Sequence, residues 1–147
     1  TRRIMMNKNE FKQELHECAK NRGFEWHNRN YYNNSQNMIT VINIQKSNFS
    51  DSYYINYGFC IKDIHKELNY PKIRECDIMG RFANGEKKDV FDLCILDVNE
   101  LKVCIEDNFE KVIVPVMNEG IEKYFELYPQ AICAAKLTLK RYLGKEK

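Results

Sequence analysis

The sequence predicts a single α+β domain in which a twisted, mostly antiparallel sheet is covered on one face by helices. Three observations carry this prediction: helical periodicity at the start, β-branched and aromatic residues over residues 24–61, and helical periodicity again from residue 97 onward. The chain has 147 residues, enough to enclose one core but not two. Residues 1–147 are therefore expected to form one domain, with residues 1–6 as a disordered or non-native start.

The first expected element is a helix over residues 7–22, in which apolar residues recur at helical spacing. Asn7, followed three positions later by Glu10, has the pattern of a capping box at the helix start. Gly23 stands where a left-handed residue would end the helix, because glycine adopts that conformation without steric cost. Both ends of this helix are thus marked in the sequence.

A sheet of about four to five strands is expected next. Residues 24–61 predict a meander of three strands, with breaks at residues 33–37 and 47–52, where Asn, Ser and Asp cluster. A short extended piece at residues 77–82 is a candidate fourth strand. Residues 89–96 are expected to form a final, mostly buried strand, because apolar side chains occur at both parities.

The C-terminal part is expected to be helical. Asp97 with Glu100 repeats the capping pattern, and a long amphipathic helix follows. Pro115 should kink or end that helix, since proline lacks the N–H that a helix interior needs. A shorter helical piece and a final basic helix over residues 129–147 complete the expected order.

Composition and charge limit the classes of partner that the protein is expected to bind. The 23 basic and 21 acidic residues are interspersed and leave a net charge of +2, so no strong field favours nucleic acid or an anionic membrane. No run of apolar residues approaches the length of a membrane span, and no signal peptide is recognisable. A cytoplasmic location is therefore expected, with a protein partner or a homodimer as the open alternatives.

Cysteine and histidine patterns do not predict a metal site. The six cysteines lack any CxxC pair and are expected to be reduced, buried thiols. The three histidines fall on a helix, a strand and a loop, so no local pair has ligand spacing. No metal and no cofactor is therefore expected.

Local catalytic signatures are also missing from the sequence. Neither a nucleophile elbow nor a phosphate-binding loop occurs. Asp89 and Asp92 lie three apart in an expected strand, hence on opposite faces, which is poor geometry for a general acid and base. We therefore expect solvated carboxylates here, and the sequence favours a protein that is not an enzyme.

One polar group is unusual for a sheet. Asn43, Gln45, Lys46 and Ser47 end the second expected strand, and Asn56 lies within the third, although strand interiors disfavour Asn. Their side chains are predicted either to bind a ligand or to tie the strand ends to the intervening loop. The second alternative is favoured, because buried amides must find partners.

The same segments resemble a known family. Gly23-Phe24, the Gln-Lys-Ser run that ends at Ser47, and the Ile-Asn-x-Gly run that ends at Gly58 resemble motifs of a largely bacterial family, domain of unknown function 4304. Arg81 with Phe82 resembles that family's later Arg-Leu pair, and Asp89 with Phe91 its Asp-x-Trp stretch, although both hydrophobic residues differ. The resemblance covers about residues 11–125 and leaves the final basic helix outside.

What the resemblance implies is an α+β domain without an established activity, ligand or cofactor. Its matching polar positions are the candidate ligand-binding residues of this chain: Gln45, Lys46, Ser47, Asn56 and Arg81. A structural role is the favoured expectation for these five as well.

Three functions compete on the sequence alone. The leading hypothesis is a non-catalytic binding or regulatory domain of the immunity-like kind. A small hydrolase or nucleic-acid-processing enzyme, with a site near Gln45, Lys46, Asn56 and Arg81, is the second. A structural or homodimerisation module, using the Tyr-rich strand of residues 53–61 or the helix at Pro115, is the third. The deciding observation is whether Gln45, Asn56 and Arg81 line one solvent-reachable pocket.

Overall fold

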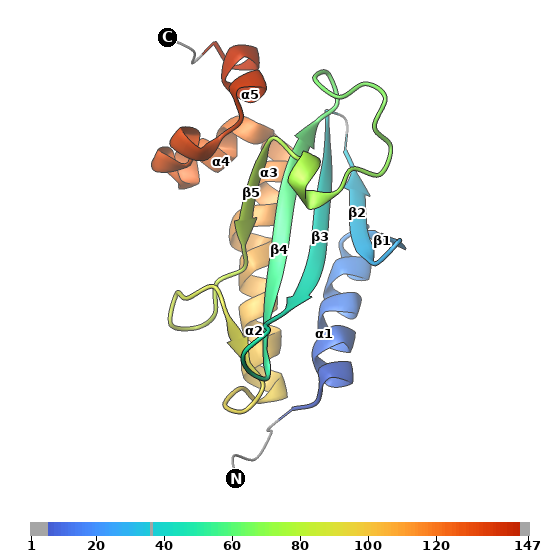
Figure 1. Ribbon diagram of the computed structural model, residues 1–147, viewed down its shortest axis with the longest axis vertical. Helices are drawn as coiled ribbons and strands as arrows, with labels where there is room; N and C mark the ends of the chain where they lie inside the picture. Colours follow the sequence, from blue (N-terminus) through green and yellow to red (C-terminus); the bar gives the residue numbers. More distant parts are fainter. Residues whose placement is uncertain (1–5, 36, 145–147) are drawn as a thin grey trace.

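The structure is a computed structural model that describes residues 6–35 and 37–144, and it has the predicted α+β fold. One sheet stands in front of two long helical segments, and short helices follow at one end (Figure 1). The elements are α1 (Lys8–Asn21), β1 (Glu25–His27), β2 (Asn30–Asn34), β3 (Met38–Lys46), β4 (Ser52–Ile61), the 3₁₀ turn η1 (Ile73–Glu75), β5 (Ile78–Arg81), β6 (Phe91–Asp92), α2 (Val98–Asn108), the π-helical segment η2 (Phe109–Ile113), α3 (Val114–Glu119), α4 (Ile121–Leu127), the 3₁₀ helix η3 (Pro129–Ala134) and α5 (Leu137–Tyr142).

The sheet is antiparallel throughout, with the strand order β1-β2-β3-β4-β5. The short strand β6 pairs with the beginning of β4, next to the segment of β4 that pairs with β5. β3 and β4 form the long centre of the sheet, as the alternation of apolar residues predicted. The predicted meander is confirmed, with one additional strand at its first edge.

The first expected strand is in fact a hairpin. Asn28 and Arg29 both have positive φ, 48° and 68°, and reverse the chain between β1 and β2. Asn is among the few residues that tolerate this conformation, and two such residues in succession match the twist of paired strands. The sequence prediction treated residues 24–32 as one strand and missed this turn.

Residues 89–96 do not form the predicted final strand. Only Phe91 and Asp92 pair with β4, after which the chain turns. The Asp92 carboxylate accepts a hydrogen bond from the backbone N–H of Cys94, at 2.9 Å, and this local bond competes with strand pairing. Ile95 is consequently exposed instead of buried.

Pro115 does not end the long C-terminal helix. The helix widens into the π-helical segment η2 before the proline, and α3 then continues to Glu119. Pro115 therefore lies in the first turn of α3, where a missing N–H costs little. The capping of α2 is as predicted, since the Asp97 side chain accepts from the N–H of Glu100 at 2.8 Å.

The predicted final helix over residues 129–147 is divided. Pro129 begins the 3₁₀ helix η3, and the short helix α5 follows only after Ala135 takes an extended conformation. Residues 145–147 lie outside the described residues, as do residues 1–5. None of the helices in the described part of the chain is long and apolar enough to cross a membrane.

The main core lies between the sheet and the helices α1, α2 and α3, which cover one face, the inner face (Figure 1). α1 has both predicted ends: the capping box between Asn7 and Glu10 is formed, and Gly23 has a φ of 83°. Met6 is 1% exposed and belongs to this core. Met6 is therefore ordered, and the rest of the segment expected to be disordered or non-native, residues 1–5, lies outside the described residues.

The outer face of the sheet is covered only at one end. Residues 62–77 fold over the ends of β3 and β4 that lie near Ile39 and Cys60. This segment encloses a second, smaller hydrophobic cluster of Tyr32, Ile39, Val41, Cys60 and Cys76, with Leu68 and Ile73 packed against it. The remaining end of the outer face is open to solvent, and it carries the polar residues Gln45, Asn56 and Arg81.

Candidate functional site

A shallow groove of about 510 Å³ lies on the open end of the outer face. β3 contributes Gln45, β4 contributes Asn56, and β5 contributes Arg81, so three adjacent strands build its floor. The remaining lining residues are Ile73, Met79, Gly80 and Asp89. Gln45, Asn56 and Arg81 therefore line one solvent-reachable groove. We call it the outer groove.

The Arg81 guanidinium is the centre of a hydrogen-bond network. Its Nε donates to Asn56 Oδ1 at 3.0 Å, and its Nη2 donates to Gln45 Oε1 at 3.4 Å. Its Nη1 forms an ion pair with Asp89 Oδ2 at 3.2 Å. Each guanidinium nitrogen therefore has a partner, and the head group is held in one orientation.

Sheet register explains why these side chains meet. Asn56 is directly paired with Asn43 on one side and with Arg81 on the other, and paired residues point to the same face. The Asn56 Nδ2 donates to both Asn43 Oδ1 and Gln45 Oε1, each at 3.0 Å. One asparagine thus links all three strands across the outer groove.

Tyr54 supports the guanidinium from below. Its ring lies on the same face of β4 as Asn56, and Arg81 Cζ is 4.1 Å from the ring centroid. A guanidinium stacked at this distance has a favourable cation–π contact, which further restricts its rotamers. Tyr54 was not among the candidate residues predicted from the sequence, although its parity with Asn56 in β4 places both on one face.

Asp89 reaches the outer groove from the loop between β5 and β6. The Asn84 side chain shapes that loop by accepting from the N–H groups of Glu86 and Lys88 and donating to Val90 O. Asn108 of α2 anchors the loop through hydrogen bonds to both backbone groups of Ala83. The acidic partner of Arg81 is thereby positioned from the helical layer.

Lys46 and Ser47 do not contribute to the outer groove. Lys46 points to the opposite face, where its Nζ lies 5.7 Å from the Tyr53 ring centroid and donates to the carbonyl oxygens of Ser47 and Ser50. Ser47 is buried, and its hydroxyl accepts from the N–H of Phe49. These two residues hold the β3–β4 loop in place. For Ser47, this is the role predicted by the alternative in which the polar side chains tie the strand ends to the loop.

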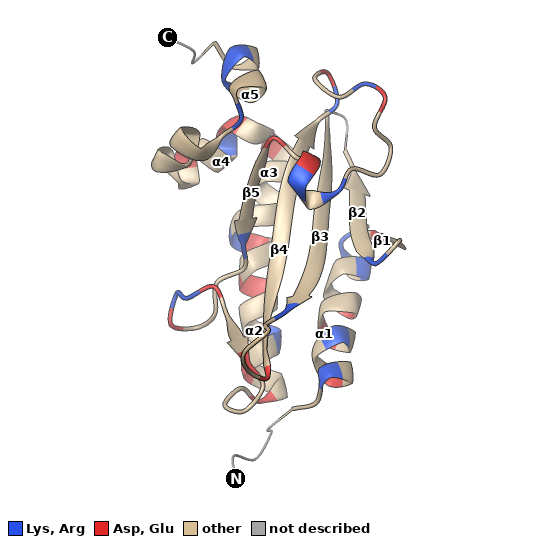
Figure 2. Cartoon of the chain, viewed as in Figure 1, with Lys and Arg blue, Asp and Glu red and all other residues tan. Residues whose placement is uncertain are grey.

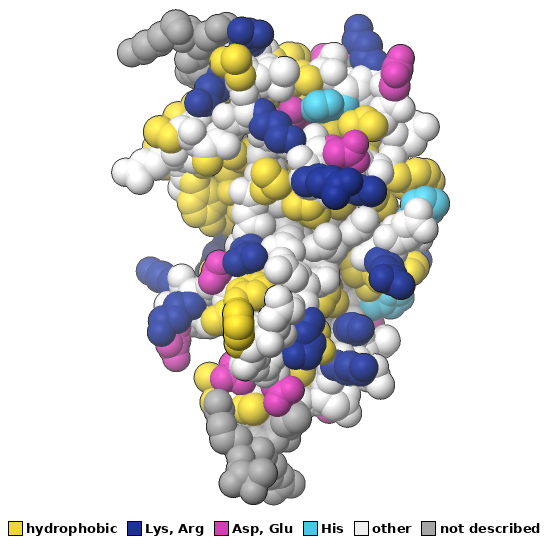
Figure 3. Space-filling model, in the orientation of Figure 1, with side chains coloured by type: hydrophobic (Ala, Val, Ile, Leu, Met, Phe, Trp, Pro, Cys, Tyr) yellow, Lys and Arg dark blue, Asp and Glu magenta, His cyan; other side chains and the backbone are white. Residues whose placement is uncertain are grey.

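Charge is sparse near the outer groove. Lys46 is the only charged residue in β3 and β4, and the remaining charges lie on helices, loops and edges (Figure 2). On the face that Figure 3 shows, acidic and basic side chains are scattered among polar and hydrophobic ones. Arg81 and Asp89, with side chains 37% and 59% exposed, supply the charge within the groove itself.

The network leaves hydrogen-bonding capacity for a ligand. The Asn43 and Gln45 side chains accept hydrogen bonds from Asn56 through their oxygens. Within the described residues, their amide nitrogens donate no hydrogen bond to the protein, so both keep free donors. Amide donors and a guanidinium next to one another recognise carboxylates and peptide carbonyl groups. The outer groove can therefore bind polar groups without rearranging its strands.

Asn56→Val should separate a structural role from a binding role. Valine suits a strand better than asparagine, and the freed partners at this partly exposed position can bond water instead. We expect the free energy of unfolding to change by no more than about 1 kcal/mol. Urea denaturation measures this change, and a loss of several kcal/mol would mean that the network mainly stabilises the fold.

The chain belongs to the family described as a domain of unknown function (DUF4304), whose model matches residues 15–119, about seven-tenths of the 147 residues. Comparison with curated proteins gives no match, and comparison with solved structures gives none either. The matched range contains Gln45, Asn56, Arg81 and Asp89. Four of the polar residues through which the sequence resembles this family thus meet in the outer groove, whereas Lys46 and Ser47 do not.

Proposed function

We propose that this member of the DUF4304 family is a non-catalytic binding domain whose outer groove recognises a protein partner through a carboxylate group. One observation carries the proposal: residues far apart in the sequence, Gln45, Asn56 and Arg81, converge in an exposed and internally braced groove. A preorganised site loses little side-chain entropy when it binds, so more of the contact energy appears as affinity.

The shape and composition of the groove support a protein as the partner. Small-molecule sites enclose most of their ligand, whereas this groove is shallow and built on flat strands. Tyr54, Met79 and Arg81 are of the residue types enriched in protein interfaces. Met79 is 43% exposed, so an apolar contact is available beside the polar network.

Carboxylate recognition follows from the pairing of Arg81 with Asp89. The Asp89 side chain is 59% exposed, and such exposed ion pairs contribute little to stability. An acidic residue of a partner can therefore replace Asp89 on the guanidinium at small cost, and a bidentate contact would add geometric specificity. Gln45 and Asn43 offer further donors on the same side.

We further propose a regulatory, immunity-like role in a bacterial cytoplasm. The six free cysteines support this location, since thiols persist in a reducing compartment. Cys18, Cys60 and Cys76 are buried as predicted, whereas Cys133 is exposed. An exposed thiol of this kind is more compatible with the cytoplasm than with an oxidising environment.

The competing functions gain less support. The enzymatic alternative needed Lys46 in the same cleft, and Lys46 lies on the opposite face. The dimer alternative used the Tyr-rich strand or the helix at Pro115, and in that strand Tyr53 and Tyr57 are 4% exposed and belong to the core. Only Tyr54 of that strand faces the groove with its ring, so a protein partner at the groove fits better.

Replacing Arg81 should abolish partner binding. Affinity capture from the lysate of the native cells should recover a near-stoichiometric partner with the wild-type protein and lose it with Arg81→Ala. Loss of a central arginine typically costs more than about 1.4 kcal/mol, a factor of about ten in affinity. Isothermal titration of the recovered partner measures the change.

Arg22→Ala is the matched control, because Arg22 also pairs with an exposed carboxylate, Glu110, and stacks on a ring, Phe109, but lies on the helical side. This control should keep the partner. The proposal fails if the wild-type protein recovers no near-stoichiometric partner, or if Arg81→Ala binds that partner as well as Arg22→Ala does.

A further inference from the structure

Three side chains with metal-binding groups meet under the segment that covers the outer face. Cys60 lies at the end of β4, His65 in the following loop, and Asp77 directly before β5. One ligand atom from each lies within 4.8 Å of the others. Cys60 is 1% exposed and Asp77 is fully buried, whereas the His65 side chain is 22% exposed.

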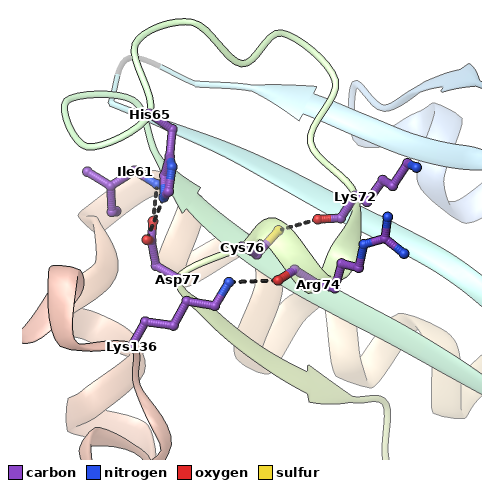
Figure 4. Close-up of polar contacts among 7 residues, drawn as sticks. All are labelled: Ile61, His65, Lys72, Arg74, Cys76, Asp77 and Lys136. Carbon is purple, nitrogen blue, oxygen red and sulfur yellow. Dashed lines mark hydrogen bonds and ion pairs between the residues drawn. The ribbon is translucent and has the colours of Figure 1, made fainter.

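The Asp77 carboxylate is unusual in being completely buried. Its Oδ2 accepts the backbone N–H of Ile61 at 2.7 Å, and its Oδ1 lies 2.7 Å from His65 Nε2. Figure 4 shows the two side chains facing one another. A buried carboxylate is costly unless a positive charge or several donors compensate it.

Lys136, whose backbone bonds to Asp77, does not provide that compensation with its side chain. The Lys136 Nζ donates to the Arg74 carbonyl oxygen at 2.6 Å, and Figure 4 shows it directed there. Only the backbone N–H of Lys136 bonds to Asp77, through the Asp77 carbonyl oxygen. His65 is thus the direct side-chain partner of the carboxylate, and it is neutral unless it carries a second proton.

The spacing of the three groups fits one zinc-sized ion. Zn²⁺ bonds to cysteine sulfur at about 2.3 Å and to nitrogen or oxygen at about 2.0–2.2 Å, so two ligands at the tetrahedral angle lie about 3.3–3.7 Å apart. The ligand atoms of Cys60, His65 and Asp77 lie within 4.8 Å of one another, so side-chain movements of about 1 Å would bring all three to that spacing. An ion between His65 Nε2 and Asp77 Oδ1 would replace the proton that they share and move them apart by about 0.5 Å.

We propose that Cys60, His65 and Asp77 form a binding site for a divalent transition-metal ion of the Zn²⁺ class, with the fourth position open to water. Thiolate and imidazole ligands select Zn²⁺ over Mg²⁺ or Ca²⁺, which prefer oxygen ligands alone. The partly exposed edge of His65 gives the ion and a water molecule access. The site is independent of the outer groove and of its partner.

Cys76 completes the surroundings of this site. Cys76 is buried beside Cys60 in the smaller hydrophobic cluster, and its sulfur donates to Lys72 O at 3.5 Å. The metal would also join β4 to residues 62–77 and thereby hold the covering segment in place.

Cobalt provides the direct test, because Co²⁺ occupies zinc sites and absorbs in the near ultraviolet when a thiolate binds it. The titration uses a Cys133→Ser variant, called the parent protein below, because this substitution removes the exposed thiol. We expect metal-free parent protein to bind one equivalent of Co²⁺ with a thiolate charge-transfer band, and Zn²⁺ to displace it. Native mass spectrometry measures the stoichiometry.

Ligand variants identify the site. Cys60→Ser should remove the charge-transfer band, and Asp77→Asn should weaken Co²⁺ binding by more than about 100-fold, beyond the effect typical of a neighbouring partner. Cys18→Ser is the control, because Cys18 is also buried but lies on α1. It should bind as the parent does, and circular dichroism checks that each variant is folded.

Two results would overturn the proposal. The first is the absence of a thiolate band from the metal-free parent at saturating Co²⁺, which needs no variant and is independent of folding defects. The second is a band that persists unchanged in Cys60→Ser. A further readout is thermal: bound Zn²⁺ should raise the melting temperature of the parent, since a ligand that binds only the native state stabilises it.

Discussion

Tyr57→Ala should lower the free energy of unfolding by about 3–5 kcal/mol, the usual cost of truncating a fully packed aromatic residue. Tyr57 is 4% exposed, and its ring contacts Phe59, Phe82 and Tyr124. Its hydroxyl bonds to that of Tyr124 at 2.8 Å. The variant loses ring contacts on every side and leaves a buried hydroxyl without its partner. Urea denaturation at constant temperature measures the loss.

Tyr54→Ala is the control for this prediction. Tyr54 is a residue of the same type three positions earlier in β4, but it faces the outer groove and is only half-buried. Its loss should cost about 1 kcal/mol or less, as for other exposed cation–π contacts. Equal losses for the two variants would contradict the assignment of one face of β4 to the core.

Gly80→Ala should destabilise the protein by about 3 kcal/mol, the upper end of the range for overpacked positions. A Cβ at Gly80 would lie 2.9 Å from Cε1 of Tyr57 and closer still to its Cζ and hydroxyl. Tyr57 cannot move aside easily, because its burial and its bond to Tyr124 fix the ring. The same urea titration reports the loss.

The two positions should compensate one another. Tyr57→Leu shortens the side chain beneath Gly80, so adding Gly80→Ala to that variant should cost much less than it costs alone. The expected coupling is about 1–3 kcal/mol, the range for residues in direct contact. Additive effects in this double-mutant cycle would show that the close approach of Tyr57 to Gly80 does not control packing here.

The close approach also bears on the outer groove. Gly80 stands between Met79 and Arg81, whose side chains face the groove, while Tyr57 lies beneath it. The absent side chain lets the sheet pack tightly on its core at this point. Arg81 thus stands on a firmly supported strand, which suits a site that must be preorganised.

Local patterns predicted the long elements well. The start of α1 was readable because the capping box depends on residues three apart, Asn7 and Glu10. β3 and β4 were readable because alternation over nine or ten residues is a strong signal. The sequence left open whether Gln45 and Asn56 meet, and the register between β3 and β4 brings their side chains to 3.0 Å.

Other features depend on contacts that no local pattern reports. The turn at Asn28 and Arg29 interrupts the first predicted strand. The hydrogen bond that the Asp92 carboxylate accepts from the Cys94 N–H replaces strand pairing after β6. Arg81 reaches Gln45 because β5 pairs with β4, and Asp89 reaches Arg81 from a loop that Asn108 anchors. Sequence analysis identified these residues, but it did not determine their convergence.

The Cys60, His65 and Asp77 cluster illustrates the same limit. Zinc sites are recognised in sequences by closely spaced pairs of ligands, and here the ligands are five and twelve residues apart in sequence. The three ligands come together because the chain leaves β4, passes over the outer face in residues 62–77 and returns beside β4 as β5. A search by spacing alone misses such a site.

The most direct test of the central claim is the affinity of Asn56→Val for the partner that wild-type protein recovers. This variant removes the residue that links the three strands of the outer groove, and it is expected to keep its stability. If the groove is a binding site, the dissociation constant should rise at least about tenfold while the unfolding free energy changes by no more than about 1 kcal/mol. An unchanged dissociation constant in this folded variant would contradict the proposed function.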